Sequence, residues 1–432
     1  MASDGDLAAL RRQQERLTQW SGQIVIIDLL CMMVLPLERL EVPGTGFVVN
    51  DVAVAFLAVL AAFRAPKIKG QHLTWVPILL ATAVGILVMS YLLNGTVPYI
   101  LGLDGRRRIA HLALMSILVI SLGTGRIHPR SAVAGLSTGV LLATVLAFFK
   151  IGGDAYPGRL SGYFGDPNVA GLILAVLGPV IVGSAKTKPR MVLYGGIVVA
   201  GILATQSRTA LLAAGLALVW AIIGRAATRF QAWFFPIIAI TLITNVPREW
   251  RTAGAFQNRT GSDWLRDQLL ILETQAVDRA PWYGNGPNSA FTWFGDNFFL
   301  YHSSYLAARA EGGWPFLLVI LGLYVLVFWW LVSLPRQQGN LWMEASVPAV
   351  LGMALHLGDV FYSTTSMVFL GMAVWHIRQV RQQISQEATE AAEAADIARA
   401  ATEVPPAPSA VRWGAASGGY PPGFVPSASR QR

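Results

Sequence analysis

Long apolar runs separated by short polar stretches dominate the hydrophobic pattern of the chain. Because a spanning helix needs ~20 predominantly apolar residues, runs of this kind are typical of membrane helices. The pattern predicts an all-α fold, a polytopic membrane helix bundle of about 12 transmembrane helices. The runs are residues 22–37, 47–63, 73–93, 109–123, 131–149, 168–184, 190–205, 208–223, 231–246, 303–332, 342–357 and 359–377. We expect an interfacial turn in the long tenth run, just before Gly312-Gly313.

The polar stretches divide the chain into five parts. One polar stretch between the apolar runs, residues 247–302, is much longer than the others. Within it, Trp264 to Val277 has the leucine spacing of a helix. We therefore expect one large outward-facing loop that carries short helices. After the last run, residues 387–399 could form a short helix, and Pro, Gly and Ser then predict a disordered tail. The parts are an N-terminal arm 1–21, helices one to nine over 22–246, a large outward-facing loop 247–302, helices ten to twelve over 303–378, and a tail 379–432.

The composition agrees with a membrane protein. The chain is 54% hydrophobic and only 13% charged, about half the charged fraction of an average soluble domain. Its net charge of +9 suits contact with anionic lipid, and no basic-aromatic pattern indicates nucleic acid as a partner. Cys31 is the single cysteine, which excludes disulfides and cysteine metal sites. The N-terminal arm lacks the pattern of a cleaved signal peptide, so we expect the first run to be its own anchor.

Lysine and arginine in the short loops predict the orientation, because cytoplasmic loops carry an excess of them. Both termini are then cytoplasmic, and loops 38–46, 94–108, 150–167, 206–207 and 247–302 face outward. The basic loops on the cytoplasmic side are Arg64–Lys69, Arg126–Arg130, Lys186–Arg190, Arg225–Arg229, Arg336 and Arg378–Arg381. The outward side nevertheless carries arginines, among them Arg106, Arg107, Arg108 and Arg159. They are either solvated loop charges or groups that bind an anion.

Three residues carry the candidate chemistry. Arg208 lies at a membrane boundary, where a guanidinium either snorkels to headgroups or binds a diphosphate bidentately. Arg266 lies on the expected loop helix, and Arg259 precedes it in a polar turn. His302 lies where the loop re-enters the membrane; it is either a structural histidine or a base that takes a proton from a hydroxyl.

Other candidates allow simpler explanations. Asn168 follows Gly165-Asp166-Pro167 and is expected to cap the helix that starts at Val169. Asp28 and Asp359 lie in or near apolar runs, and whether they are functional or paired stays open. No cluster of His, Cys and carboxylates has the spacing of metal ligands, and the only Asp-X-Asp lies in the N-terminal arm. We therefore expect no metal and no cofactor, with arginines neutralising a diphosphate instead.

Four motifs together resemble the O-antigen ligase and O-antigen polymerase superfamily of bacterial membrane glycosyltransferases. They cover about residues 155 to 320 in the order of that family. The motifs are Arg159-Leu160-Ser161-Gly162 with Asp166-Pro167-Asn168, Thr205-Gln206-Ser207-Arg208, Arg266 with Pro281 to Gly286, and His302-Ser303-Ser304-Tyr305-Leu306 with Glu311-Gly312-Gly313. The family often has Asn at the position of Ser303 and Trp at that of Leu270.

The resemblance implies a metal-independent, inverting glycosyl transfer in the bacterial inner membrane, on its outer side. The donor is a glycan on a polyprenyl diphosphate, and the acceptor is a lipid-core sugar for a ligase or a second lipid-linked glycan for a polymerase. His302, Arg266 and Arg208 are the expected catalytic residues. The expected substrate-binding residues are Arg106, Arg107, Arg108, Arg159, Asn168, Arg259, Tyr305 and Glu311. A transporter or flippase for a lipid-linked oligosaccharide is the alternative from another class.

Overall fold

The computed structural model describes residues 23–45, 48–68, 73–94, 104–153, 156–244 and 260–402. Within these residues the protein is mostly helical, with thirteen α-helices, one 3₁₀ turn (η1, Gly162–Phe164) and one β-hairpin. Three helices, α4 (Trp75–Asn94), α6 (Pro129–Phe148) and α13 (Ser304–Val332), are long and apolar enough to cross a membrane. The coarse expectation of a mostly helical protein with helices able to cross a membrane is thus confirmed.

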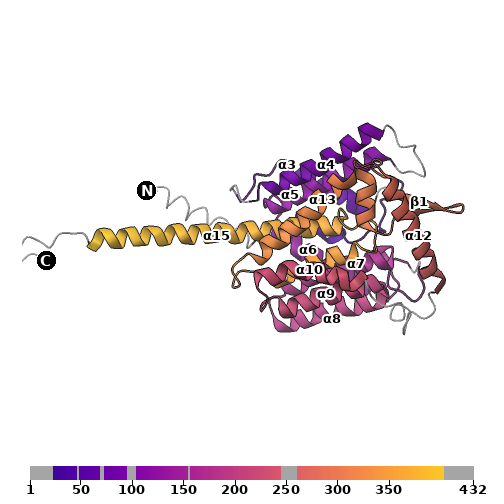
Figure 1. Ribbon diagram of the computed structural model, residues 1–432. Helices are drawn as coiled ribbons and strands as arrows, with labels where there is room; N and C mark the ends of the chain where they lie inside the picture. Colours follow the sequence, from indigo (N-terminus) through magenta and orange to yellow (C-terminus); the bar gives the residue numbers. More distant parts are fainter. Residues whose placement is uncertain are drawn as a thin grey trace, which may run out of the picture. The chain divides into compact units, whose positions relative to one another are not determined.

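Each of the twelve apolar runs falls on one helix. Besides the three long ones, these are α2 (Ile26–Val34), α3 (Val49–Ala62), α5 (Gly105–Gly123), α7 (Pro167–Gly183), α8 (Lys188–Thr205), α9 (Arg208–Ile223), α10 (Arg229–Thr244), α14 (Leu341–Met353) and α15 (Thr364–Thr402). The thirteenth helix, α12 (Thr260–Arg279), lies in the expected large loop and contains the helix predicted at Trp264 to Val277. Figure 1 shows most of the helices side by side, with α12 across one end of the bundle.

Local capping explains where several helices begin. The side chain of Asp166 accepts hydrogen bonds from the backbone N–H groups of Asn168 at 2.6 Å and Val169 at 3.4 Å, and Pro167 occupies the first turn of α7. Asn168 is therefore not the helix cap, and that expectation was wrong. The cap is instead Asp166, two residues earlier, and it is followed by proline, which has no backbone N–H that needs a partner at the first helical position.

Small residues let neighbouring helices pack closely. A Cβ added at Gly135 or Gly139 of α6 would collide with backbone carbonyl oxygens of α2, those of Leu29 and Met33. Close approach of this kind is typical of membrane helices, whose association depends on van der Waals contact. The α2–α6 pair is accordingly among the most closely packed in the bundle.

Helix α13 is kinked at Gly313, whose φ of 72° and ψ of −167° are not helical. The kink leaves room for the loop that follows α12: Trp314 N–H donates to the Trp282 carbonyl at 2.9 Å, and a Cβ at Gly313 would collide with that carbonyl. A turn was expected just before Gly312-Gly313, and the structure has it at Gly313. The first part of α13, which begins just after His302, is thereby separated from the apolar part.

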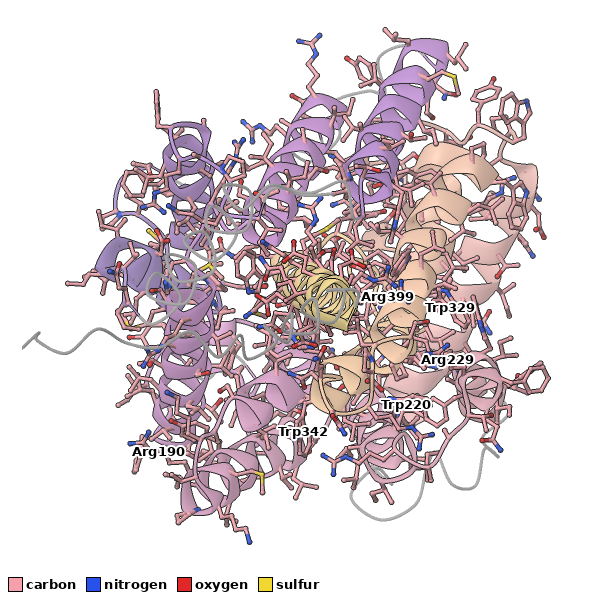
Figure 2. All side chains as sticks on the ribbon, turned by 90° about the vertical axis from the view of Figure 1, so that its left-hand side faces the viewer. Arg190, Trp220, Arg229, Trp329, Trp342 and Arg399 are labelled. Carbon is pink, nitrogen blue, oxygen red and sulfur yellow. The ribbon has the colours of Figure 1, made fainter. Side chains whose placement is uncertain are left out.

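Loop contacts collect at two ends of the bundle, and successive helices have one terminus at each. One end, which we call the basic end, is formed by residues 23–25, 64–68, 123–131, 224–229, 330–342 and 375–381. The contacts there are Val25–Ser131, Arg64–Arg126, Lys67–Thr124, Arg229–Ser333, Arg336–Ala227, Arg378–Gly123 and Arg381–Trp330. Figure 2 looks onto this basic end and shows Arg190, Arg229 and Trp342 there. These are the loops that sequence assigns to the cytoplasmic side.

The other end carries the loops that were expected to face outward. The contacts are Arg39–Tyr163, Leu160–Ala204, Asn94–Gly284, Asn288–Asp104 and Ser304–Leu357. We call this the loop end. Residues from Ser385 form a second compact unit, in which the helical structure extends to Thr402 and includes the helix expected at 387–399.

Asp28, left open in the sequence, is a structural residue of the basic end. Its fully buried carboxylate accepts hydrogen bonds from Arg64 Nη1 at 2.7 Å and from the backbone N–H of His128 at 2.7 Å. One buried carboxylate therefore ties α2 to the loops that follow α3 and α5. The pairing explains how a buried aspartate is tolerated in the first apolar run.

Candidate functional site

A hairpin and a helix position His302 at the loop end. Strands β1 (Phe291–Phe294) and β2 (Asn297–Leu300) pair antiparallel, and Tyr301 N–H extends the ladder to the Ala290 carbonyl at 3.1 Å. The chain then reaches His302 and enters α13, where Ser303 is the N-cap. This hairpin was not expected from the sequence. It aligns His302 beside α12, which lies across the same end of the bundle (Figure 1).

The imidazole of His302 is held by a buried carboxylate that sequence reasoning missed. Glu273 of α12 is fully buried, and its Oε1 lies 3.2 Å from His302 Nδ1 and 2.9 Å from the His302 backbone nitrogen. The His302 side chain is 39% exposed, so part of the ring is accessible to solvent. A carboxylate only accepts hydrogen bonds, so it favours the tautomer with hydrogen on Nδ1 and a lone pair on Nε2.

Tyr301, next to His302, has a buried hydroxyl that is a weaker acid than usual. Burial raises the pKa of its hydroxyl to about 12, and the nearby Glu273 carboxylate adds to the shift. Tyr301 therefore keeps its proton at neutral pH. The other oxygen of Glu273, Oε2, is buried without a hydrogen-bond partner among the described residues.

Arg266 lies on the same helix and the same face as Glu273. The two residues are seven positions apart, which is two helical turns or ~10.5 Å along α12. Leu269 and Val277 lie on this face and are buried, whereas Arg266 near the start of the helix is exposed. Helix α12 thus carries both the partner of His302 and the arginine singled out from the sequence. Arg259 lies outside the described residues.

A second group joins Arg159, Asn168 and the turn before Arg208. Arg159 Nε donates to the Thr205 carbonyl at 2.9 Å, and its Nη2 lies 3.4 Å from Asn168 Oδ1. Gln206, in the left-handed conformation with φ 48°, ends α8, and Ser207 caps α9. Arg208 is the first residue of α9 and is half-buried. Two of the four motifs, separated in sequence, therefore meet at the loop end.

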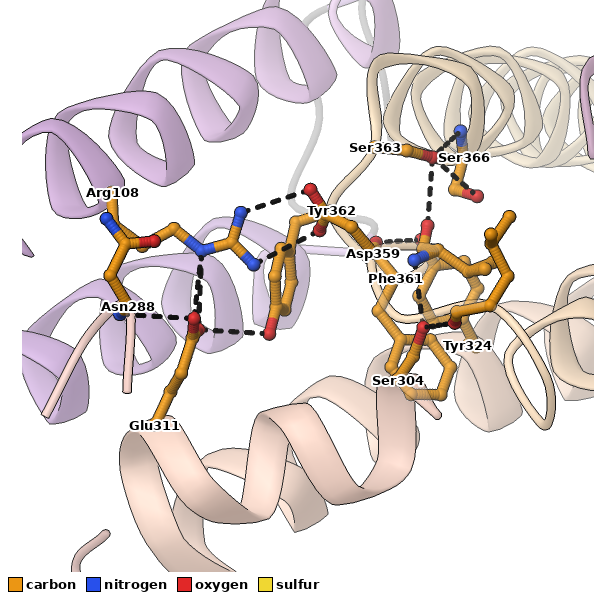
Figure 3. A network of polar contacts seen from close by, with 12 residues as sticks. Arg108, Asn288, Ser304, Glu311, Tyr324, Asp359, Phe361, Tyr362, Ser363 and Ser366 are labelled. Carbon is orange, nitrogen blue, oxygen red and sulfur yellow. Dashed lines mark hydrogen bonds and ion pairs between the residues drawn. The ribbon is translucent and has the colours of Figure 1, made fainter. Parts of the chain in front are cut away.

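A third group is a buried ion network around Arg108 (Figure 3). Its two terminal nitrogens each lie 3.1 Å from an oxygen of Asp359, and its Nε lies 3.3 Å from Glu311. The guanidinium carbon lies 4.4 Å from the ring centroid of Tyr362. Glu311, 2% exposed, also accepts from Tyr362 Oη at 3.3 Å and from the Asn288 N–H at 3.2 Å. Arg108 and Glu311, both expected to bind substrate, are thus engaged with protein groups.

The other expected residues have simpler surroundings. Arg106 and Arg107 are exposed, and Arg106 Nε donates to the Tyr91 hydroxyl at 3.1 Å, which raises the pKa of Arg106. Tyr305 donates its hydroxyl to the Leu351 carbonyl at 3.1 Å and stacks edge-on against Phe361. The Tyr305 side chain therefore joins α13 to α14.

One backbone contact and one electrostatic effect connect these groups. A Cβ at Gly358 would collide with the Tyr301 carbonyl, so the segment that carries Asp359 packs directly on the residue before His302. Glu38 lies between α2 and α3. Burial raises the pKa of its carboxyl, and the negative charges of Asp359, Asp51 and Asp166 raise it further, to about 7. The loop end therefore combines arginines with carboxylates from several segments.

Within the described ranges, no group of three or more His, Cys, Asp or Glu side chains is arranged to hold a metal ion. The signal that could have revealed Glu273 is its spacing from Arg266, since seven residues on a helix return to the same face.

Comparison with known protein families finds no family that matches the chain, and comparison with curated proteins finds no similar sequence.

Proposed function

We propose that the protein is a membrane glycosyltransferase of the O-antigen ligase or polymerase type. It transfers a glycan from a polyprenyl diphosphate to an acceptor sugar hydroxyl, without a metal ion. In this proposal the twelve apolar helices cross the bacterial inner membrane, both termini are cytoplasmic, and the loop end faces outward. The segregation of the basic loops to the opposite end supports this orientation.

The observation that carries the proposal is the pair formed by His302 and Glu273. With hydrogen on Nδ1, the accessible Nε2 of His302 accepts the proton of the acceptor hydroxyl as its oxygen attacks the anomeric carbon. The bond between that carbon and the diphosphate oxygen breaks, and polyprenyl diphosphate leaves with the electron pair. Glu273 stabilises the imidazolium that forms, and a base in this role contributes roughly 10²–10⁴-fold to the rate.

The leaving diphosphate gains negative charge, and fixed guanidinium groups stabilise it. Arg266 is exposed on the face of α12 that also carries Glu273, so a cation lies on the element that orients the base. Arg159 fixes the turn that begins α9, so Arg208 is presented from a defined helix start. Both arginines belong to the loop end.

The experiment is transfer from a polyprenyl-diphosphate glycan by purified protein in nanodiscs, with and without a lipid-core acceptor. His302→Ala, Glu273→Gln and Arg266→Ala should each lower the rate at least about 100-fold at matched protein level. Arg190→Ala, an arginine at the basic end, is the matched control and should be unaffected. Near-normal transfer by His302→Ala would refute the proposal.

Two further readings of the same assay sharpen the result. A product ladder without the lipid-core acceptor indicates a polymerase, whereas a single transfer that needs the acceptor indicates a ligase. Chelation should leave the rate unchanged. Movement of labelled lipid-linked glycan across vesicles without any transfer would favour the transporter instead.

A further inference from the structure

The hairpin presents an aromatic face toward solvent. Because side chains alternate along a strand, the register places Phe291 and Trp293 of β1 on the same face as Phe298 and Leu300 of β2. The Phe291 and Phe298 rings lie 5.1 Å apart, and those of Trp293 and Phe298 lie 5.6 Å apart. Trp293 is 48% exposed and Leu300 is 57% exposed. We call these four residues the aromatic face.

The opposite face of the hairpin is the one that anchors it. Phe294 lies on that face and packs edge-on against Trp264 of α12, with ring centroids 5.9 Å apart. A two-stranded hairpin is marginally stable alone, so this anchor fixes its position relative to α12. The aromatic face therefore stays exposed. Because exposed aromatic surface is unfavourable in water, a ligand that covers this face would gain free energy.

We propose that the aromatic face binds the glycan of a substrate, a neutral oligosaccharide that stacks on Trp293 and Phe298. This inference rests on the proposed function and adds a binding site for the sugar chain. Pyranose rings present faces of C–H groups, which complement the negative face of an aromatic ring. Asp296, in the exposed turn of the hairpin, offers a hydrogen-bonding group to sugar hydroxyls.

Position and charge favour a glycan over a lipid surface. Figure 1 shows the hairpin extending beyond α12, away from the ends of the bundle helices rather than alongside them. Between Phe291 and Tyr301 the single charged residue is Asp296, so no lysine or arginine in this segment would attract an anionic membrane. Strand β2 ends at Leu300, two residues before His302. A sugar chain bound along the aromatic face therefore extends toward the proposed base.

The test measures glycan binding separately from catalysis. Two probes are used with the full-length protein in nanodiscs, both prepared from the cells that produce the protein. The first is the donor glycan, released by mild acid from the polyprenyl-diphosphate lipid. The second is the acceptor oligosaccharide, taken from the lipid core. Binding of one probe identifies whether the donor or the acceptor chain occupies the face. Trp293→Ala should weaken that binding roughly five- to tenfold, and Trp293→Phe should restore most of it. Trp233→Ala, an exposed tryptophan of α10, is the matched control and should bind normally.

The possible outcomes separate this inference from the proposed function. Wild-type affinity in Trp293→Ala, or no binding of either glycan to the wild type, overturns the aromatic-face proposal and leaves the role of His302 untouched. Conversely, undiminished transfer by His302→Ala refutes the proposed function even where Trp293→Ala still loses glycan binding. Quenching of Trp293 fluorescence by brominated lipids, taken as the difference between wild type and Trp293→Phe, would assign the face to the membrane and also overturn the inference.

Discussion

Replacement of Arg108 by methionine should destabilise the loop end through the charge it leaves behind. Glu311 is 2% exposed and forms an ion pair with Arg108, whereas its other donors, Tyr362 and Asn288, are neutral. Without Arg108 the protein must bury an uncompensated carboxylate or protonate it. Loss of one partner of a buried ion pair costs about 3–5 kcal/mol of the free energy of unfolding.

The two carboxylates around Arg108 should contribute unequally. Asp359 is 54% exposed, so solvent screens its pair with Arg108, and Asp359→Asn should cost about 1 kcal/mol or less. Glu311→Gln removes the buried charge while it keeps the shape of the side chain. The double variant Arg108→Met/Glu311→Gln should therefore recover most of the stability that Arg108→Met loses.

The measurement is a double-mutant cycle on the free energy of unfolding, obtained by detergent-induced unfolding in mixed micelles. Arg107→Met, which removes a neighbouring exposed arginine, controls for the loss of positive charge at this end. An equal cost of Arg108→Met in the wild-type and Glu311→Gln backgrounds would show that the two residues are not coupled. The reasoning from buried charge would then be refuted.

Two further predictions follow from buried or half-buried carboxylates. Because Glu38 has a pKa of about 7 when folded, the folded protein holds its proton while the unfolded chain releases it at lower pH. The stability that this group contributes should therefore fall as pH rises toward and through 7. Glu38→Gln should be more thermostable than wild type at pH 8 but equal to it at pH 4. A difference in melting temperature between the two proteins that stays constant across pH would contradict this. Asp28→Asn should lower the free energy of unfolding by about 3 kcal/mol, since it removes the charge that Arg64 faces at 2.7 Å, while Asp267→Asn on the exposed side of α12 should have little effect.

The helices could be predicted because their signal is local. Apolar runs of suitable length mark them directly, and each of the twelve runs corresponds to one helix. Most helix ends were predictable to within about five residues, but α15 continues to Thr402, well beyond the end of the twelfth run at residue 377. The cap at Asp166 was assigned to Asn168, since both residues are good caps. The hairpin had a readable signal as well: Gly295-Asp296 separates two aromatic stretches of four residues, and this is a two-residue turn.

The partners of the charged residues could not be predicted from one sequence. Arg108 meets Glu311 across 203 positions of sequence and Asp359 across 251, and no local pattern encodes such pairs. The same is true of Glu273, which lies 29 positions before His302 on a different element. A sequence shows which residues carry charge, whereas the bundle decides which charges compensate each other.

This distinction changes the interpretation of the arginines that violate the positive-inside pattern. The charge of Arg108 is compensated by two carboxylates, and Arg159 is fixed by the Thr205 carbonyl and Asn168, so both stabilise loop contacts. A catalytic site needs such supporting residues, because a base or cation placed an ångström away from its target loses most of its effect. The arginines of the loop end therefore divide into those that hold the loops in place and those that remain exposed. Arg266 is the clearest example of the second kind, and it lies on the helix that carries Glu273, the partner of His302.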